Sequence, residues 1–305
     1  MNEQIEKTPL PLEISMLYGG AESLFRGFLR NTTQKRELAK YLAAAITDRA
    51  AEFPGDTLEI FDFGSSKGTL ISIFSGHLIA EQIGKPVHIT CVEPEDSSVK
   101  ELLHTAEVIE DMSHGKISVT VIQNTWQQIV NPEHSEAQKP KNVAMAVHLS
   151  YHIPEEDLDE VLENTVNGLS KKGVFILISR LYDDVFEFNR AFYEKITGKK
   201  FNSLTLSNVI PAVDRLVTKD KRLRTRTDTV KAKVTLNLDS NLSEALRIIA
   251  FLAGVEVEQI SSNIELQQEI FDYFGGKRDV QLEQIDGVYI IARNGEHPDS
   301  HNHST

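Results

Sequence analysis

The chain has 305 residues, 40% of them hydrophobic and 25% charged, which is typical of a soluble globular protein with a substantial core. Its net charge of −13 disfavours a general nucleic-acid or anionic-membrane binder, because phosphate contacts need clustered Lys and Arg. The single cysteine, Cys91, excludes an internal disulfide and favours a reducing cytoplasm. No signal-like N-terminus is recognisable, and no stretch reaches the roughly 18 apolar residues of a membrane span.

Residues 1–55 are expected to form an N-terminal helical lid. Within them, the stretch 21–46 carries apolar residues at helical spacing in two runs, and Asn31-Thr32-Thr33 between the runs offers N-cap chemistry. We therefore predict two helices in this segment. Its aromatic side chains are candidate substrate contacts: Tyr18, Phe25 and Phe28.

From residue 57 to 180, strand patterns alternate with helix patterns. Nearly continuous apolar runs predict strands at 57–63, 87–93, 116–122, 142–148 and 174–180. Amphipathic runs between them predict helices at 69–83, 97–112 and 154–169. This alternation indicates a Rossmann-like α/β core over 56–182, with a parallel sheet, helices on both faces, and a ligand crevice at the carboxyl ends of the strands.

After residue 182 the pattern changes. It predicts helices at 185–198, 205–217, 242–254 and 263–276, and strands at 222–238 and 286–293. We expect 183–294 to supply substrate-cap helices and the closing strands of the same sheet, and 295–305 to form a disordered tail. The tail contains HPDSHNH, but a disordered role is favoured over a metal role, and no metal site is expected.

The turn after the first predicted strand, DFGSSKG (62–68), is a candidate ligand loop. Its spacing matches neither the phosphate loop G-x-x-x-x-G-K-[ST] nor the dinucleotide pattern G-x-G-x-x-G. It is similar to the first motif of class I S-adenosylmethionine-dependent methyltransferases, an acidic residue followed by x-G-x-G-x-G. The alternative is a plain strand-turn-helix connection. Candidate cofactor residues here are Asp62, Gly64, Ser65, Ser66 and Gly68, and Lys67 is expected to face solvent or pair with a carboxylate.

Polar residues also follow the next predicted strands. Glu93 is the first charge after VHITCV, where a carboxylate can accept from both ribose hydroxyls of a nucleoside cofactor. After the third strand, Gln123, Asn124 and Thr125 are candidates for the adenine edge, and Trp126 either covers the ring or belongs to the core. The fourth strand runs into VHLSYHIPEEDL, whose candidate catalytic side chains are His148, Tyr151 and His152.

Three segments resemble the histamine N-methyltransferase group. SLFRGFLRNTTQKRELAKYL is similar to its F-R-R-F-L-N-H-S-T-E segment, HLSYHIPEEDL is similar to its M-L-Y-Y-V-K-D stretch, and two late helices precede a closing strand, DGVYIIAR. The resemblance implies a seven-stranded methyltransferase sheet, mostly parallel with one antiparallel strand near the C-terminus, and a helical cap. By position it also implies cofactor contacts at Ser98 and Val147 and substrate contacts at Gln34 and at Gln284 or Ile285.

We therefore expect S-adenosyl-L-methionine-dependent methyl transfer to a small molecule, at an amine nitrogen. A neutral Gln34 stands where the group has a glutamate, so the amine is expected to differ from histamine. Two alternatives remain: an O-methyltransferase acting on a carboxylate or phenol, and a non-catalytic binding protein that keeps the fold. A nicotinamide oxidoreductase is disfavoured by the missing G-x-G-x-x-G. The sequence predicts no oligomeric state.

Overall fold

A computed structural model describes residues 24–199, 206–239, 241–253 and 255–293, without the side chains of Phe25, Tyr151 and 206–208. The chain divides into two compact units. Unit 1 comprises Met1–Thr33, Asp183–Asn202 and Lys233–Glu283. Unit 2 comprises Gln34–Tyr182, Ser203–Ala232 and Gln284–Thr305. No helix in the described part of the chain is long and apolar enough to cross a membrane.

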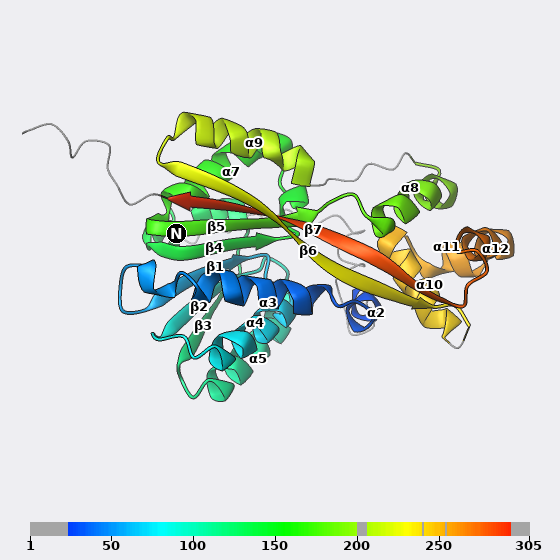
Figure 1. The fold of residues 1–305 in the computed structure, drawn as a ribbon, viewed down its shortest axis with the longest axis horizontal. Coiled ribbons are helices and arrows are strands. Elements are labelled where there is room, and N and C mark those ends of the chain that lie inside the picture. The colour runs from blue at the N-terminus through cyan, green and yellow to red at the C-terminus, as the bar shows by residue number, and fades with distance from the viewer. Residues whose placement is uncertain (1–23, 200–205, 240, 254, 294–305) are drawn as a thin grey trace, which may run out of the picture. The chain divides into compact units, whose positions relative to one another are not determined.

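Seven strands form one sheet in the order β3-β2-β1-β4-β5-β7-β6 (Figure 1). Strands β1 to β5 pair in parallel, and β7 runs antiparallel to β5. The predicted mostly parallel sheet with an antiparallel strand near the C-terminus is therefore confirmed. The strands are β1 (Leu58–Phe63), β2 (Val87–Val92), β3 (Ile117–Ile122), β4 (Lys141–Val147), β5 (Leu169–Arg180), β6 (Leu223–Asn237) and β7 (Asp279–Arg293).

Two strands begin earlier than expected. β5 starts at Leu169 rather than at 174, because Leu169 pairs with Lys141 and the register then shifts before Val174 pairs with Val143. A side chain at Gly173 would meet the carbonyl oxygens of Lys141 and Ser170 at 2.9 Å, so only glycine fits this irregularity. β7 starts at Asp279 rather than at 286, and its additional residues alternate between exposed and buried positions, as a half-buried strand does.

Helices cover both faces of the sheet within unit 2, as predicted. They are α3 (Gln34–Thr47), α4 (Thr69–Ala80), α5 (Asp96–Met112), α6 (Trp126–Val130), α7 (Glu155–Asn167) and α9 (Leu206–Lys219), with 3₁₀ turns η1 (Ala50–Glu52), η2 (Ser135–Gln138) and η3 (Ser150–His152). Unit 1 contains α2 (Leu24–Asn31), α8 (Asp184–Thr197), α10 (Leu242–Ala253), α11 (Val257–Ser261) and α12 (Ile264–Tyr273). Among the described α-helices, only α6 and α11 were not expected, because five residues are too few to display a helical period.

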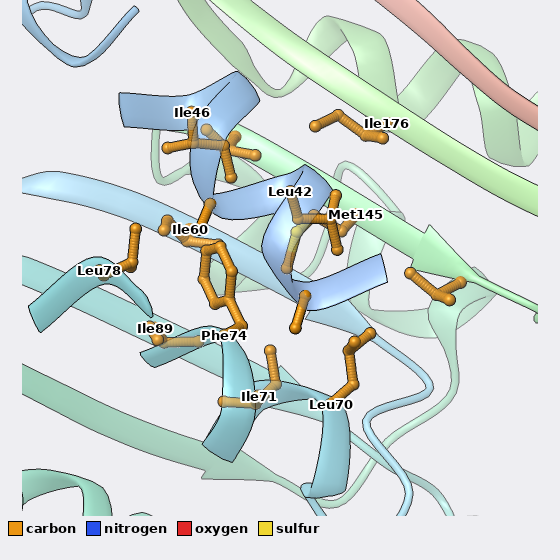
Figure 2. Packing of buried hydrophobic residues seen from close by; sticks show 14 of the residues in the cluster. Leu42, Ile46, Ile60, Leu70, Ile71, Phe74, Leu78, Ile89, Met145 and Ile176 are labelled. Atoms are coloured by element: carbon orange, nitrogen blue, oxygen red, sulfur yellow. The ribbon is translucent and has the colours of Figure 1, made fainter. Parts of the chain in front are cut away.

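Each face of the sheet has its own apolar core. On one face, Leu42 and Ile46 of α3 and Phe74 of α4 pack with Ile60 and Met145 of the strands (Figure 2). On the other face, side chains of α6, α7 and α9 pack against Phe61, Phe63 and Phe175, among others. Burial on both faces is the reason that β1 and β4 read as nearly continuous apolar runs.

Unit 1 has a separate aromatic core. Phe28 of α2 lies with its ring centroid 4.8 Å from that of Phe251, and Phe188 of α8 stacks on Phe274 at 5.6 Å. The predicted substrate contact Phe28 is thus a buried core residue of this unit.

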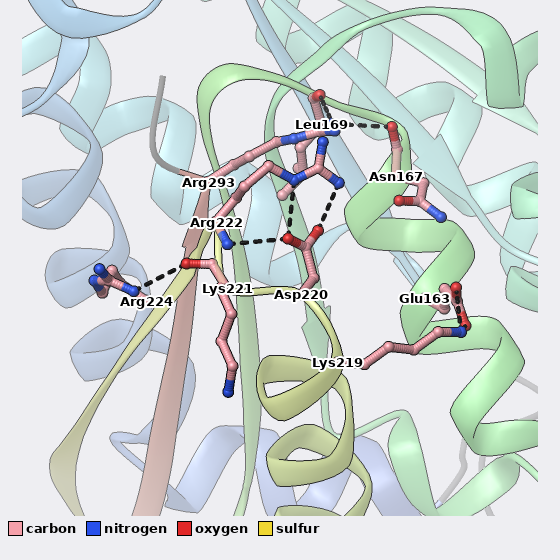
Figure 3. Close-up of polar contacts among 9 residues, drawn as sticks. All are labelled: Glu163, Asn167, Leu169, Lys219, Asp220, Lys221, Arg222, Arg224 and Arg293. Carbon is pink, nitrogen blue, oxygen red and sulfur yellow. Dashed lines mark hydrogen bonds and ion pairs between the residues drawn. The ribbon is translucent and has the colours of Figure 1, made fainter. Parts of the chain in front are cut away.

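Polar contacts join α7, α9 and β7 near the amino end of β5. Arg293 donates to the carbonyl oxygens of Asn167 and Leu169, and Lys219 pairs with Glu163 at 2.7 Å (Figure 3). Asp220 accepts two hydrogen bonds from the Arg222 guanidinium, which lowers the pKa of the Asp220 carboxyl to about 2. These contacts lie at the opposite end of β5 from the candidate site.

Candidate functional site

The turn between β1 and α4 has a backbone that only small residues adopt easily. Gly64 and Gly68 have φ of 74° and 82°, and Ser66 has φ of 51°. A Cβ at Gly64 would lie 2.9 Å from Leu149 Cδ1, and one at Gly68 would lie 2.8 Å from Leu102 Cδ1. The first contact also shows that the glycine turn touches the segment that follows β4. The end of β1, where the cofactor is expected, and the end of β4, where the methyl acceptor is expected, therefore meet here.

Two buried carboxylates lie at this turn, at the ends of β1 and β2. Asp62 is 2% exposed and Glu93 is 8% exposed. Burial raises the pKa of Asp62 to about 7, against the opposing effects of the Ser65 hydroxyl and the Lys35 charge. Burial likewise raises the pKa of Glu93, although its oxygens accept from the backbone N–H groups of Ser66 (2.8 Å) and Glu95 (3.1 Å).

This pair of acids fits a ligand with an ammonium group and ribose hydroxyls. Burying a carboxylate is unfavourable unless a cation or several donors accompany it. Each Glu93 oxygen accepts one bond here and keeps a lone pair for a hydroxyl donor. These two acceptors thus suit S-adenosylmethionine better than a phosphate, which two carboxylates would repel.

The other predicted cofactor residues take part in local structure. The Thr125 hydroxyl caps α6 by accepting from Gln128 N–H, and Asn124 Oδ1 accepts from Thr125 N–H at 2.8 Å. Ser98 is buried in the first turn of α5, where its N–H donates to Glu95. Trp126 belongs to the core, with its indole donating to Thr165 Oγ1 at 2.9 Å.

Lys67 pairs with a carboxylate, which is one of the two outcomes predicted for it. Its Nζ lies 2.8 Å from Glu101 Oε1 of α5, and the side chain is only 8% exposed. The cation in the glycine turn is therefore neutralised by the neighbouring helix.

A second polar cluster lies where β4 ends. β4 stops at Val147, which is buried, and His148 takes φ of 55° while its N–H donates to Ile178 O at 2.8 Å. The His148 Nε2 atom lies 3.2 Å from Asp286 Oδ1 and 2.9 Å from Gln34 Nε2. Gln34 Nε2 also donates to Asp286 Oδ2 at 2.9 Å. The cluster joins residues from α3, the end of β4 and β7, all within unit 2.

Asp286 orders this cluster. Its side chain is fully buried, which by itself raises the pKa of the carboxyl, but the charge and hydrogen bonds of His148 and Gln34 outweigh burial and hold that pKa below its usual value. A carboxylate only accepts, so Gln34 Nε2 donates to it. The role of His148 Nε2, which lies near both Asp286 and Gln34 Nε2, depends on the tautomer. With its proton on Nε2 the neutral ring donates to Asp286, and Nδ1 carries the lone pair that can accept a proton.

The remaining candidates lie at other positions. His152 is exposed on η3, and Gln284 is buried on β7, two residues before Asp286 and therefore on the same face of that strand. Tyr18 and the side chains of Phe25 and Tyr151 lie outside the described residues. The His-containing tail also lies outside them, and no group of three metal-ligating side chains occurs in the part of the chain that is described.

Sequence reasoning missed Asp286, Lys35 and Arg180. The signal for Asp286 was present, since it is a charge at the border of an apolar strand, the feature that selected Glu93. Lys35 lies next to Gln34 in the first turn of α3, and Arg180 pairs in register with Asp286 across β5 and β7.

No protein-family model and no curated protein sequence matches the chain. Among solved structures, a loganic acid methyltransferase with SAH has a TM-score of 0.55 at 9% identity, covering 92% of this chain and 100% of that one. A Bacillus halodurans C-125 protein described as a methyltransferase reaches 0.49 at 13% identity, over 83% of this chain and 98% of that one. A mycolic acid cyclopropane synthase complexed with SAH also reaches 0.49, at 14% identity, over 94% and 100%.

The first of these likenesses, together with the strand order, establishes the fold. The chain has the Rossmann-like fold of S-adenosylmethionine-dependent methyltransferases.

Proposed function

We propose that this protein is an S-adenosylmethionine-dependent methyltransferase that acts on an amine nitrogen of a small molecule. The observation that carries the proposal is the meeting of two sites at the carboxyl ends of the strands. Asp62 and Glu93 form one site, and the Asp286–His148 pair forms the other, with Gly64 against Leu149 between them. Open α/β sheets bind ligands at this edge.

At the cofactor end, Glu93 would accept from the ribose hydroxyls and Asp62 from the ammonium of S-adenosylmethionine, directly or through water. When bound, this cofactor supplies a methyl group on a positively charged sulfur that leaves readily. The glycine turn lets backbone approach the ligand without a side chain between them.

At the acceptor end, His148 Nδ1 takes the proton that the amine must lose, and Asp286 stabilises the imidazolium that results. These residues would hold the acceptor nitrogen towards the methyl group that the cofactor supplies, and transfer of that methyl would leave the electron pair of the carbon–sulfur bond on sulfur. Holding the nitrogen and the methyl carbon about 3–3.5 Å apart and in line can supply much of the rate, because the leaving group is already activated.

The finer resemblance supports an amine other than histamine. Gln34 and His148 occupy the segments that resemble the histamine N-methyltransferase group, but here the negative charge comes from Asp286. The loganic acid methyltransferase takes its name from an acid. A screen of methyl acceptors, read out by SAH release, should therefore include acids and phenols as well as amines. A reducing cytoplasm suits the buried free thiol of Cys91.

The test of the cofactor site is Glu93→Ala. Its binding of S-adenosylmethionine and of the demethylated product S-adenosylhomocysteine (SAH) is measured by calorimetry. Loss of charge-assisted bonds to two hydroxyls should weaken binding by roughly 10²-fold, on the order of 1.5–3 kcal/mol. Glu93→Gln, which keeps the side-chain shape, should show a smaller loss in the same direction. The matched control is Glu107→Ala on the exposed face of α5, where the side chain is 79% exposed and affinity should not change. Unchanged affinity in both Glu93 variants would remove the site assignment.

A further inference from the structure

Two cations adjoin Asp286 without forming a hydrogen bond or ion pair with any described residue. Arg180 is the last residue of β5 and lies opposite Asp286 in the antiparallel pairing. Lys35 is half-buried in the first turn of α3, next to Gln34. The charge of Arg180 acts to lower the pKa of Asp286, and the charge of Asp286 acts to raise the pKa of Lys35, although burial lowers the latter overall.

Of the two cations, Arg180 gives the stronger evidence for a bound anion. Its Nε–H is buried and has no hydrogen-bond partner among the described residues. A buried donor that belongs to a charged group is costly to leave unpaired. A guanidinium presents its donors as a fork that matches a carboxylate, which would satisfy Nε and a terminal nitrogen together.

Asp286 is not that carboxylate. Its oxygens accept from Gln34 Nε2 at 2.9 Å and lie 3.2 Å from His148 Nε2, and no hydrogen bond joins them to the Arg180 Nε–H. Lys35 also lies close enough to Asp62 for the two charges to interact, so two acids, Asp62 and Asp286, accompany the two cations. The Arg180 Nε–H is the donor that still has no acceptor among the described residues, and a carboxylate from outside the chain would supply one.

We propose that Lys35 and Arg180 bind a carboxylate carried by the methyl acceptor itself, so that the substrate is an amino acid or a close analogue. This inference rests on the proposed function. The acceptor's amine faces His148 while its carboxylate engages the two cations, so the substrate's own charges complement the locus. Simple amines lack the second group and should bind less tightly.

The test compares acceptors that differ only in a carboxylate: glycine and methylamine, histidine and histamine, phenylalanine and phenethylamine. Calorimetry with the SAH-loaded protein measures binding, so turnover is not needed. We expect at least one acid to bind roughly 10–100-fold tighter than its amine partner. Arg180→Gln and Lys35→Gln should each remove most of that preference, while the amine partner changes by less than about threefold, and Arg180→Lys should restore part of it.

Lys40→Gln is the matched control, because it removes an exposed cation from the same helix as Lys35. Equal affinity for every acid and amine pair, or an equal loss for both in Arg180→Gln, overturns the inference. SAH affinity of the Arg180 variants reports folding of the site. If the wild-type protein does not bind SAH at all, the proposed function itself fails, which is a different outcome. Identification of the methylated product adds one distinction. If the product is a methyl ester, the anion site stands, but the assignment of the amine as methyl acceptor is overturned.

Discussion

The two ends of the candidate site differ in how the surroundings of a buried carboxylate affect its pKa. At the cofactor end, Asp62 and Glu93 are buried, and burial raises the pKa of both. At the acceptor end, Asp286 is buried more completely, yet the charge and hydrogen bonds of its neighbours hold its pKa below the usual value. Glu93 and Asp286 each have two hydrogen-bonding neighbours, so charge accounts for the difference: His148 and Arg180 lower the pKa of Asp286, whereas Glu95 raises that of Glu93.

This difference indicates how each end works. A buried acid whose pKa is raised despite its internal partners is stabilised further by a ligand that brings an ammonium or hydroxyl donor. An acid that is already satisfied is a fixed part of the machinery and positions another residue. The cofactor end is therefore organised around a ligand, and the acceptor end is organised around His148.

The largest expected effect tests the acceptor end. Asp286→Asn removes the charge that orients His148 and stabilises its protonated form, so kcat should fall by roughly 10²–10⁴-fold. SAH affinity should stay within about twofold, because Asp286 does not belong to the cofactor end. Steady-state SAH release and calorimetry measure the two quantities. Asp279→Asn, at an exposed position of the same strand, is the control. An unchanged kcat in Asp286→Asn would contradict the positioning role.

A smaller effect tests the cofactor end. At pH 7 about half of the Asp62 carboxyls carry a proton, since burial raises that pKa to about 7. A bound ammonium favours the ionised form, so binding of SAH should release up to about half a proton at pH 7 and almost none at pH 9. The measurement is the dependence of the calorimetric heat on the ionisation enthalpy of the buffer. Asp62→Asn should reduce this release and weaken binding by roughly tenfold. Proton uptake on binding would contradict the assignment.

The last effect is on the stability of the fold and concerns a buried cation at the other end of the sheet. Lys141, at the start of β4, donates to the carbonyl oxygens of Glu136, Ala137 and Lys139 at 3.2–3.3 Å. Burial lowers the pKa of Lys141 to about 8, so between pH 8 and about 10.5 the unfolded chain holds the proton more tightly than the folded one. Its contribution to the free energy of unfolding should therefore rise with pH across that window.

Lys141→Met removes this dependence. Relative to the wild type, the variant's free energy of unfolding should decrease by roughly 1–3 kcal/mol between pH 7.5 and 10.5, as measured by urea unfolding. The carbonyl oxygens left without a donor lower the variant's stability at every pH and do not affect the slope. A constant difference between the two proteins across this range would show that Lys141 titrates as it does in water.

The strands and the glycine turn were accessible from the sequence because their causes are local. Five apolar runs predicted β1 to β5, and the positive φ at Gly64 and Gly68 follows from a turn that only small residues make easily. Glu93 was accessible for the same reason, as the first charge after a buried strand. The short helix α6 and the early starts of β5 and β7 were not, since no periodic pattern marks them.

By itself the sequence determined the alternation of strands and helices, the glycine turn and the acids that end β1 and β2. Only the tertiary structure decided which polar groups meet at the acceptor end. Asp286 is 252 residues from Gln34, and the two come together because β7 inserts antiparallel beside β5 in a register that places Asp286 opposite Arg180. Such pairing depends on the packing of the whole sheet, which no local pattern encodes.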